Sequence, residues 1–179
     1  LRGAVDVDSQ IQGQDFDDNA PVSVGPGSAG VMFDAAAVGI PERAEVDALM
    51  VYSNRIVFST DVAVNIGGTE YQDEDLIVYN ANTKGIAMFF DGSAAGIPAA
   101  ADLDAACFLS APGTFYFSVD VSVTLPGAGA VDDDDVISYN GAAFAKVYDG
   151  QAQLHIPTAA DLDALYLSPD NKLYFSLDT

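Results

Sequence analysis

Three stretches of this sequence repeat one another, and this internal repeat limits the folds that the chain can adopt. The copies are residues 32–61, 89–120 and 147–178. An Ile-Pro pair marks each copy, at positions 40–41, 97–98 and 156–157, so the period is 57 and then 59 residues. Self-similarity at a fixed period is typical of propellers, solenoids and other repeat architectures. The chain is therefore expected to consist of equivalent structural units.

One unit is divided between the two ends of the sequence. After the third Ile-Pro pair 22 residues remain, and these together with the first 41 residues supply one further repeat with a longer loop. We therefore predict a single repeat domain over residues 1–179. Its predicted parts are the second half of a split unit (1–41), two complete repeats (42–98 and 99–157) and the first half of the split unit (158–179).

Each complete repeat contains four strand patterns, here named A, B, C and D. In the middle repeat they are residues 103–109, 114–120, 135–139 and 143–149. These runs are alternating or wholly apolar, and Gly, Pro, Asn or Asp bounds them, as expected of strands. No window shows a convincing helical period. The sequence therefore predicts an all-β protein.

Four-stranded units in tandem suggest a β-propeller, whose blades are four-stranded sheets arranged around a channel. Three blades are fewer than the roughly four to eight of known rings. We therefore predict a homodimer that forms a six-bladed ring, in which strands A and B of the split unit pair with strands C and D of the neighbouring chain. The alternative is a monomer with pseudo-threefold symmetry, such as a β-trefoil or β-prism.

The stretch ALYLSPDNKLYFSLD (164–178) resembles the strand–turn–strand signature of blades in NHL and SMP-30-like β-propellers. The repeat as a whole is similar to tandem repeats of secreted bacterial proteins. This resemblance implies a propeller fold and a secreted or cell-surface location. It implies no catalytic residue.

The charge of the chain restricts its partners. The formal net charge is −21, with six Lys and Arg against 27 Asp and Glu. Nucleic acids and anionic membrane surfaces attract positive charge, so neither is an expected partner. No apolar stretch approaches the ~18 residues of a membrane span. Cations and basic partners are favoured.

Acidic residues recur at the ends of the predicted strands. In an antiparallel A-B-C-D sheet, the starts of A and C and the ends of B and D lie at one end, so these carboxylates gather there. Crowded carboxylates repel one another unless a cation lies between them, and Ca²⁺ takes six to eight oxygen ligands. The predicted ligands are Asp47, Asp61, Asp75, Asp102, Asp104, Asp120, Asp135, Asp161, Asp163 and Asp178. The alternative is an acidic surface that only solvates a scaffold.

No catalytic signature occurs in the sequence: there is no P-loop, His-Glu-x-x-His or Gly-x-Ser-x-Gly motif. The only histidine, His155, replaces Gly39 and Gly96 of the other units and is expected in a loop. Cys107 lies in an apolar run and is expected to be a buried core residue. We therefore predict a non-catalytic binding or structural module. The alternatives are a metal-dependent hydrolase or lactonase of the six-bladed type, and carbohydrate stacking by Tyr71, Tyr79 and Tyr139.

Overall fold

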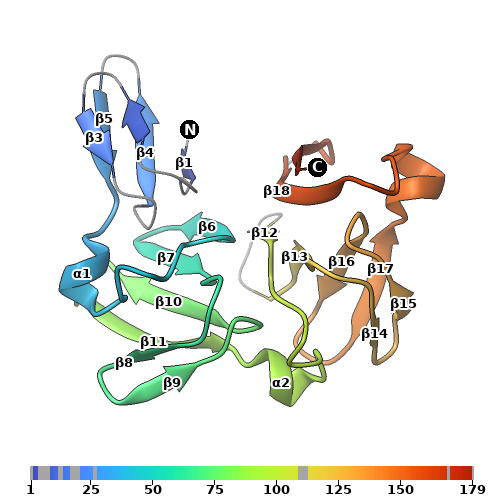
Figure 1. The fold of residues 1–179 in the computed structure, drawn as a ribbon, viewed down its shortest axis with the longest axis horizontal. Coiled ribbons are helices and arrows are strands. Elements are labelled where there is room, and N and C mark those ends of the chain that lie inside the picture. The colour runs from blue at the N-terminus through green and yellow to red at the C-terminus, as the bar shows by residue number, and fades with distance from the viewer. Residues whose placement is uncertain are drawn as a thin grey trace. The chain divides into compact units, whose positions relative to one another are not determined.

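The structure is a computed structural model that describes residues 2–3, 9–11, 14–16, 21–25, 28–108, 113–168 and 170–178. The protein is all-β, with several small antiparallel sheets, none of them closed. The chain forms two compact units, residues 1–90 and 91–179. No helix within the described ranges is long and apolar enough to cross a membrane. Figure 1 shows the elements of both units.

The first unit is built around the sheet β11-β10-β7-β6. A second sheet has the order β1-β4-β5, and two hairpins, β2–β3 and β8–β9, complete the unit. Its elements are β1 (Arg2–Gly3), β2 (Ser9–Ile11), β3 (Gln14–Phe16), β4 (Val22–Gly25), β5 (Ser28–Val31), α1 (Ala35–Val38), β6 (Leu49–Tyr52), β7 (Arg55–Phe58), β8 (Val64–Ile66), β9 (Thr69–Tyr71), β10 (Leu76–Asn80) and β11 (Gly85–Phe90).

The second unit repeats this plan with the sheet β12-β13-β16-β17. The hairpin β14–β15 and the two-stranded sheet β18–β19 accompany it. Its elements are α2 (Gly92–Ala95), β12 (Ala105–Phe108), β13 (Phe115–Ser118), β14 (Val123–Leu125), β15 (Gly129–Val131), β16 (Val136–Tyr139), β17 (Phe144–Tyr148), the π-helical turn η1 (Gly150–Leu154), β18 (Asp161–Leu167) and β19 (Leu173–Asp178).

The predicted strand order A-B-C-D is confirmed in both complete repeats. Strands β6, β7, β10 and β11 follow it in the first unit, and β12, β13, β16 and β17 follow it in the second. All neighbours are antiparallel, and the C–D pair carries a bulge at the same point in each unit, at Leu76/Ile77 and at Val136/Ile137. The two sheets are therefore versions of one four-stranded unit.

A hairpin between strands B and C was not predicted. It is β8–β9 in the first unit and β14–β15 in the second. In the first unit Gly67 and Gly68, both with positive φ, form its turn. Two glycines between short apolar runs are a recognised hairpin signal, so the sequence did contain the information for this element.

One short helical turn follows strand D in each of the three repeats, and these turns too were not predicted. An aspartate caps the N-terminus of each turn: Asp34 for α1, Asp91 for α2 and Asp149 for η1. A residue in the left-handed region ends each turn, as at many helix C-termini. With four or five residues each, these turns are too short to show a helical period in the sequence.

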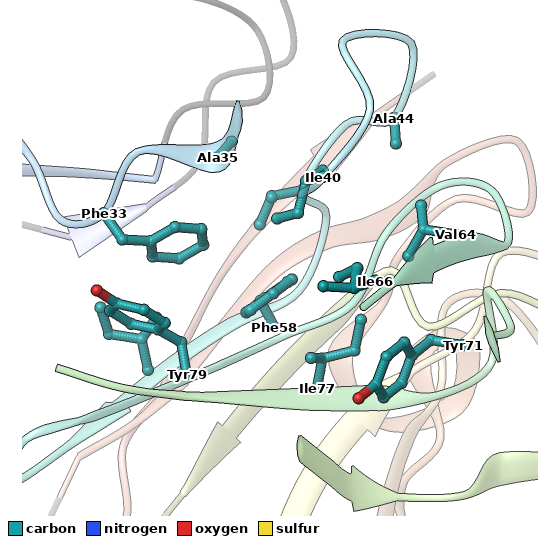
Figure 2. Packing of buried hydrophobic residues seen from close by; sticks show 12 residues of the cluster. Phe33, Ala35, Ile40, Ala44, Phe58, Val64, Ile66, Tyr71, Ile77 and Tyr79 are labelled. Atoms are coloured by element: carbon teal, nitrogen blue, oxygen red, sulfur yellow. The ribbon is translucent and has the colours of Figure 1, made fainter. Parts of the chain in front are cut away.

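The core of the first unit joins parts of successive repeats (Figure 2). Phe33, which follows β5, packs against Phe58 of β7 and Tyr79 of β10, with ring centroids 5.2 and 4.9 Å apart. Ile66 of β8 and Ile77 of β10 belong to the same buried cluster. The end of one repeat thus covers the sheet of the next.

The core of the second unit lies between β12 and β18, the A strands of successive repeats. Ala105 and Cys107 of β12 pack in one cluster with Leu162 and Leu165 of β18. The Ser118 hydroxyl donates a hydrogen bond of 3.0 Å to the carbonyl oxygen of Leu162. The sheet β18–β19 is therefore docked on the complete repeat that precedes it.

The two halves of the split repeat lie in separate sheets. Strands β18 and β19 pair with each other, and β4 and β5 pair with each other and with β1. Their predicted union into one four-stranded sheet therefore stays a prediction, as do the repeat boundaries. The acidic residues before β4, at positions 17 and 18, lie outside the described residues.

Replacing His155 with glycine is expected to stabilise the protein. His155 is exposed and ends η1 with a φ of 59°, whereas Gly39 and Gly96 occupy the equivalent positions. A left-handed conformation costs a non-glycine residue about 1–2 kcal/mol, and glycine avoids this cost. Glycine also increases the conformational entropy of the unfolded chain, which offsets part of the stabilisation. We expect the free energy of unfolding in urea to rise by about 0.5–1 kcal/mol in His155→Gly.

The control is Gln151→Gly in the same turn, where φ is not positive. This variant is expected to lose stability, because glycine is unfavourable within a helix. An unchanged or lower stability of His155→Gly would contradict the interpretation of position 155 as a strained glycine site.

Candidate functional site

The acidic residues gather at one end of each four-stranded sheet, as the sequence predicted. In the second unit, Ala105 at the start of β12 faces Ser118 at the end of β13, and Val136 at the start of β16 faces Tyr148 at the end of β17. The aspartates that flank these four strands therefore lie at the same end of the sheet. What each carboxylate contacts there differs from one position to the next.

The aspartates that follow strand D cap helical turns. The N–H groups of Ala37, Ala94 and Ala152 donate to the side chains of Asp34, Asp91 and Asp149, at 2.9, 2.8 and 2.7 Å. Each carboxylate satisfies an N–H group that a helix start leaves without a partner. These three acids therefore have a structural role.

In the two complete repeats, the predicted ligands at the end of strand B also bind the backbone. The Glu45 N–H donates to Asp61, and the Asp102 N–H donates to Asp120, each at 2.6 Å. The Asp61 and Asp120 N–H groups in turn donate to the carbonyl oxygens of Glu45 and Asp102. Each pair closes the open end of an A–B hairpin.

The loop before strand C is held by the predicted ligands Asp75 and Asp135. Asp75 accepts a hydrogen bond from the Gln72 N–H, and Asp135 accepts one from the Asp132 N–H, each at 2.9 Å. Asp135 also accepts a hydrogen bond of 3.0 Å from the Gly150 N–H and forms an ion pair with Lys146. Asp135 is therefore bound on several sides.

Asp134, beside Asp135, is in the opposite situation. It is 1% exposed, and no described residue donates a hydrogen bond to either carboxylate oxygen. Burial raises its pKa, and the charges of Asp135, Asp133 and Asp132 raise it further. An isolated buried carboxylate is costly, so such a group requires a proton or a cation.

Asp134 belongs to the one group of three possible metal-ligating side chains found among the described residues. Asp132, Asp134 and Asp135 each offer a carboxylate oxygen, and these three atoms lie within 4.8 Å of one another. Asp132 is half-buried, and the other two are buried. Three acidic oxygens at this spacing are the kind of ligands that hard cations take.

Glu74 is the counterpart of Asp134 in the first unit. It is also 1% exposed, with no hydrogen bond to its carboxylate from the described residues. Burial, together with the charges of Asp73 and Asp75, raises its pKa to about 7. Its loop does not bring three ligating oxygens together in the described part of the chain.

Four other predicted ligands lie near Asp104. Burial raises the pKa of Asp104 to about 7, and the charges of Asp161, Asp120, Asp163 and Asp178 raise it further. Asp163 accepts a hydrogen bond from the Ser176 hydroxyl at 2.7 Å. No three ligating oxygens of this group come as close together as those of the triad. Asp47 and Asp102, the remaining predicted ligands, are half-buried.

Of the three triad residues, only Asp135 is among the ligands predicted from the sequence. Asp132 and Asp134 were missing from the predicted ligands. A signal existed, because the third position of the loop is acidic in both complete repeats, as Glu74 and Asp134. That signal does not distinguish a buried carboxylate from an exposed one.

Other candidate residues have structural surroundings. Tyr71 and Tyr79 are buried in the core of the first unit, so their rings are not exposed for carbohydrate stacking, and that alternative is wrong for both. The ring of Tyr139 contacts those of Phe115 and Phe144. Cys107 is buried as predicted, and burial raises its pKa to about 11, which is unfavourable for a reactive thiolate.

No protein-family model matches this chain, and a comparison with curated proteins gives no match.

Gly150→Ala is expected to disrupt the acidic loop. A Cβ atom at position 150 would clash with the carbonyl oxygen of Asp134, which belongs to the backbone and cannot turn aside. We expect the free energy of unfolding to fall by about 1–3 kcal/mol, as for other overpacked sites. Urea unfolding measures this change. Gly113→Ala is the control, since a Cβ there meets nothing within 4 Å, and an equal loss in both variants would contradict the prediction.

Asp104→Asn is expected to remove part of the pH dependence of stability. The pKa of Asp104 is raised in the folded state from 3.8 to about 7, so between these values the folded protein binds more protons than the unfolded chain. Stability therefore falls as pH rises through this window. In chelator at pH 8 we expect the free energy of unfolding of Asp104→Asn to be about 2 kcal/mol higher than that of the wild type, a value discounted for the partial exposure of Asp104. At pH 5 we expect a smaller difference.

Urea unfolding at the two pH values is the measurement. Glu70→Gln removes one charge from an exposed residue of β9 and serves as the control. A gain at pH 8 that is equal in both variants would show a general effect of net charge instead of the local environment of Asp104.

Proposed function

We propose that the second unit binds Ca²⁺ through Asp132, Asp134 and Asp135. The observation that carries this proposal is the carboxylate of Asp134, which is buried, accepts no hydrogen bond from a described residue and lies beside two further carboxylates. A cation at this position would replace the missing hydrogen bonds and neutralise charge that otherwise destabilises the loop.

The three carboxylates have different roles in this proposal. Asp134 supplies buried oxygens with no competing donor in the described residues. Asp135 is already oriented by the N–H groups of Asp132 and Gly150. Asp132 is half-buried, at the more accessible side of the triad. Water and backbone carbonyl oxygens complete the coordination of Ca²⁺ at many protein sites.

The ammonium group of Lys146 would compete with Ca²⁺ for the carboxylate of Asp135. Its ammonium group pairs with Asp135, and in the register of the C–D pair it occupies the position of Met88 in the first unit. Removing this ammonium group would leave the triad with more negative charge. Replacement of Lys146 with methionine is therefore expected to strengthen Ca²⁺ binding.

The role proposed for the whole chain is that of a non-catalytic repeat module at the cell surface or outside the cell. The two units share the loop in which Asp75 and Asp135 bind the backbone, which favours repeated structural or binding sites over one unique catalytic centre. The two A-B-C-D sheets also support the proposal that each repeat is a propeller blade, since such blades are four-stranded sheets.

Calorimetric titration of chelator-treated protein with Ca²⁺ tests the site. We expect binding with a Kd of about 0.1–1 mM, as for extracellular modules, and a rise in Tm on adding Ca²⁺. Asp134→Asn is expected to abolish both effects, because the amide keeps the shape of the side chain and removes its charge. Lys146→Met is expected to bind Ca²⁺ several-fold more tightly.

Asp170→Asn is the matched control. Asp170 is exposed and pairs with Lys172 in the β18–β19 turn at 2.7 Å, so this variant loses the same charge far along the sequence from the triad loop. It is expected to bind Ca²⁺ like the wild type. The proposal fails if the wild type gives neither heat nor a change in Tm, or if Asp134→Asn binds Ca²⁺ with wild-type affinity.

A further inference from the structure

The turn between strands β16 and β17 begins with an asparagine that precedes a glycine. Strand β16 ends at Tyr139 and β17 begins at Phe144, so residues 140–143 form the C–D turn of the second unit. Asn140 and Gly141 open this turn, and no other asparagine of the sequence is followed by glycine. Asn-Gly pairs suit tight turns, and Gly141 has a φ of 88° here. The same pair places a carboxamide next to a backbone nitrogen that no side chain shields.

The carboxamide oxygen of Asn140 is held by two backbone N–H groups. The N–H groups of Ala142 and Ala143 each donate to Oδ1 at 3.0 Å, and Asn140 is exposed. Two donors on one carbonyl oxygen draw electron density from Cγ and stabilise negative charge that develops on this oxygen, as the donors of an oxyanion hole do. The Cγ atom of Asn140 is therefore activated toward a nucleophile.

The neighbouring nucleophile is the backbone nitrogen of Gly141. Gly141 is exposed, and no described residue accepts a hydrogen bond from its N–H group. This N–H group is therefore free to lose its proton to water. Glycine also has the widest choice of backbone conformations, so the nitrogen can rotate toward Cγ of Asn140. Both reacting atoms belong to one exposed turn.

The first unit has the same asparagine, but the nitrogen after it is bound. Asn80 ends β10, and its Oδ1 accepts hydrogen bonds from the N–H groups of Asn82 and Thr83 at 3.0 and 3.3 Å. The Ala81 N–H donates to the carbonyl oxygen of Asn54 at 2.8 Å. Asn80 is also half-buried, in contrast to its exposed counterpart in the second unit. The two C–D turns thus share the activated carboxamide and differ in the nucleophile.

We propose that Asn140 is a site of spontaneous deamidation, selected by the folded C–D turn as well as by the Asn-Gly sequence. The deprotonated nitrogen of Gly141 forms a bond to Cγ of Asn140, and negative charge moves to Oδ1. The bond between Cγ and Nδ2 then breaks, Nδ2 takes a proton from water and leaves as ammonia, and a cyclic imide remains. Water is the only co-reactant, and no atom is oxidised or reduced.

Water opens the imide at either of its carbonyl carbons. Addition at Cγ gives aspartate, whose charged carboxylate accepts the same two N–H groups more strongly than the amide oxygen. Addition at the backbone carbonyl carbon gives isoaspartate, in which the main chain runs through Cβ and Cγ. Either product adds a negative charge at the end of the β16–β17 pair that is opposite to the acidic loop before β16. The modification uses none of the proposed Ca²⁺ ligands, so its test is independent of that site.

Mass spectrometry of incubated protein tests the site. The folded protein is kept at pH 8, and its peptides are sampled over time. We expect the mass change of an NH₂ group replaced by OH at Asn140, with isoaspartate that an isoaspartyl methyltransferase labels. At Asn80 in the same samples we expect at least several-fold less conversion. The rate is expected to rise with pH, because the attack requires loss of the Gly141 proton. Asn140→Asp provides the acidic form as a standard for ion-exchange chromatography.

Ala81→Gly is the matched control, because it gives the first unit the same Tyr-Asn-Gly sequence as the second. The N–H group at position 81 still donates to Asn54 in the folded variant. We therefore expect Asn80 of this variant to deamidate several-fold more slowly than Asn140. In concentrated urea both Asn-Gly pairs are expected to react at similar rates, and the ratio of folded to unfolded rates corrects for the remaining sequence differences.

Two results would overturn the proposal. One is an Asn140 that stays intact in the folded protein under conditions in which it deamidates in urea. The other is a ratio of folded to unfolded rates at Asn80 of Ala81→Gly that equals the ratio at Asn140, because the sequence alone would then set the rate. Circular dichroism spectra before and after incubation verify that both proteins are folded.

Discussion

Carboxylate side chains that accept hydrogen bonds from backbone N–H groups hold the ends of the strands together in this protein. They do so at three places in each of the two complete repeats. In the second of these, Asp120 closes an A–B hairpin, Asp135 holds the loop before strand C, and Asp149 caps the turn after strand D. Hydrogen bonds to a charged acceptor are stronger than neutral ones, and buried N–H groups need partners. The acidic composition is therefore in part a requirement of the fold.

The same arrangement has an electrostatic cost, because it gathers negative charge at one end of each sheet. Burial is the largest cause of the raised pKa of Asp104 and of Glu74, and the charges of neighbouring carboxylates raise both pKa values further. The two units differ in whether a cationic side chain lies beside these carboxylates. The second unit places the ammonium group of Lys146 next to Asp135, and the first unit has Met88 at that position. The two units thus keep the backbone contacts of Asp75 and Asp135 and differ at the position of Lys146.

Packing between successive repeats is the second requirement of the architecture. Phe33 covers Phe58 in the first unit, and β18 packs on β12 in the second. A four-stranded sheet of this kind buries its apolar residues fully only when a neighbouring repeat covers its face and all of its strands are present. Phe117, in a complete four-stranded sheet, is 0% exposed, whereas Phe175, at the same repeat position in the two-stranded sheet β18–β19, is 39% exposed.

Local patterns in the sequence determined the strand order, the all-β class and the special position of His155, since alternation, turn residues and repeat alignment are properties of neighbouring residues. They did not reveal the hairpin β8–β9, although Gly67 and Gly68 signalled it, nor the capped turns, which are too short for a periodic signal. Only the tertiary structure decided which aspartates bind N–H groups and which, like Asp134, are buried with no such donor among the described residues. The physical reason is that the partner of a carboxylate can be distant in the sequence. The Gly150 N–H, which binds Asp135, belongs to the turn η1, and folding brings this turn to the loop before strand C.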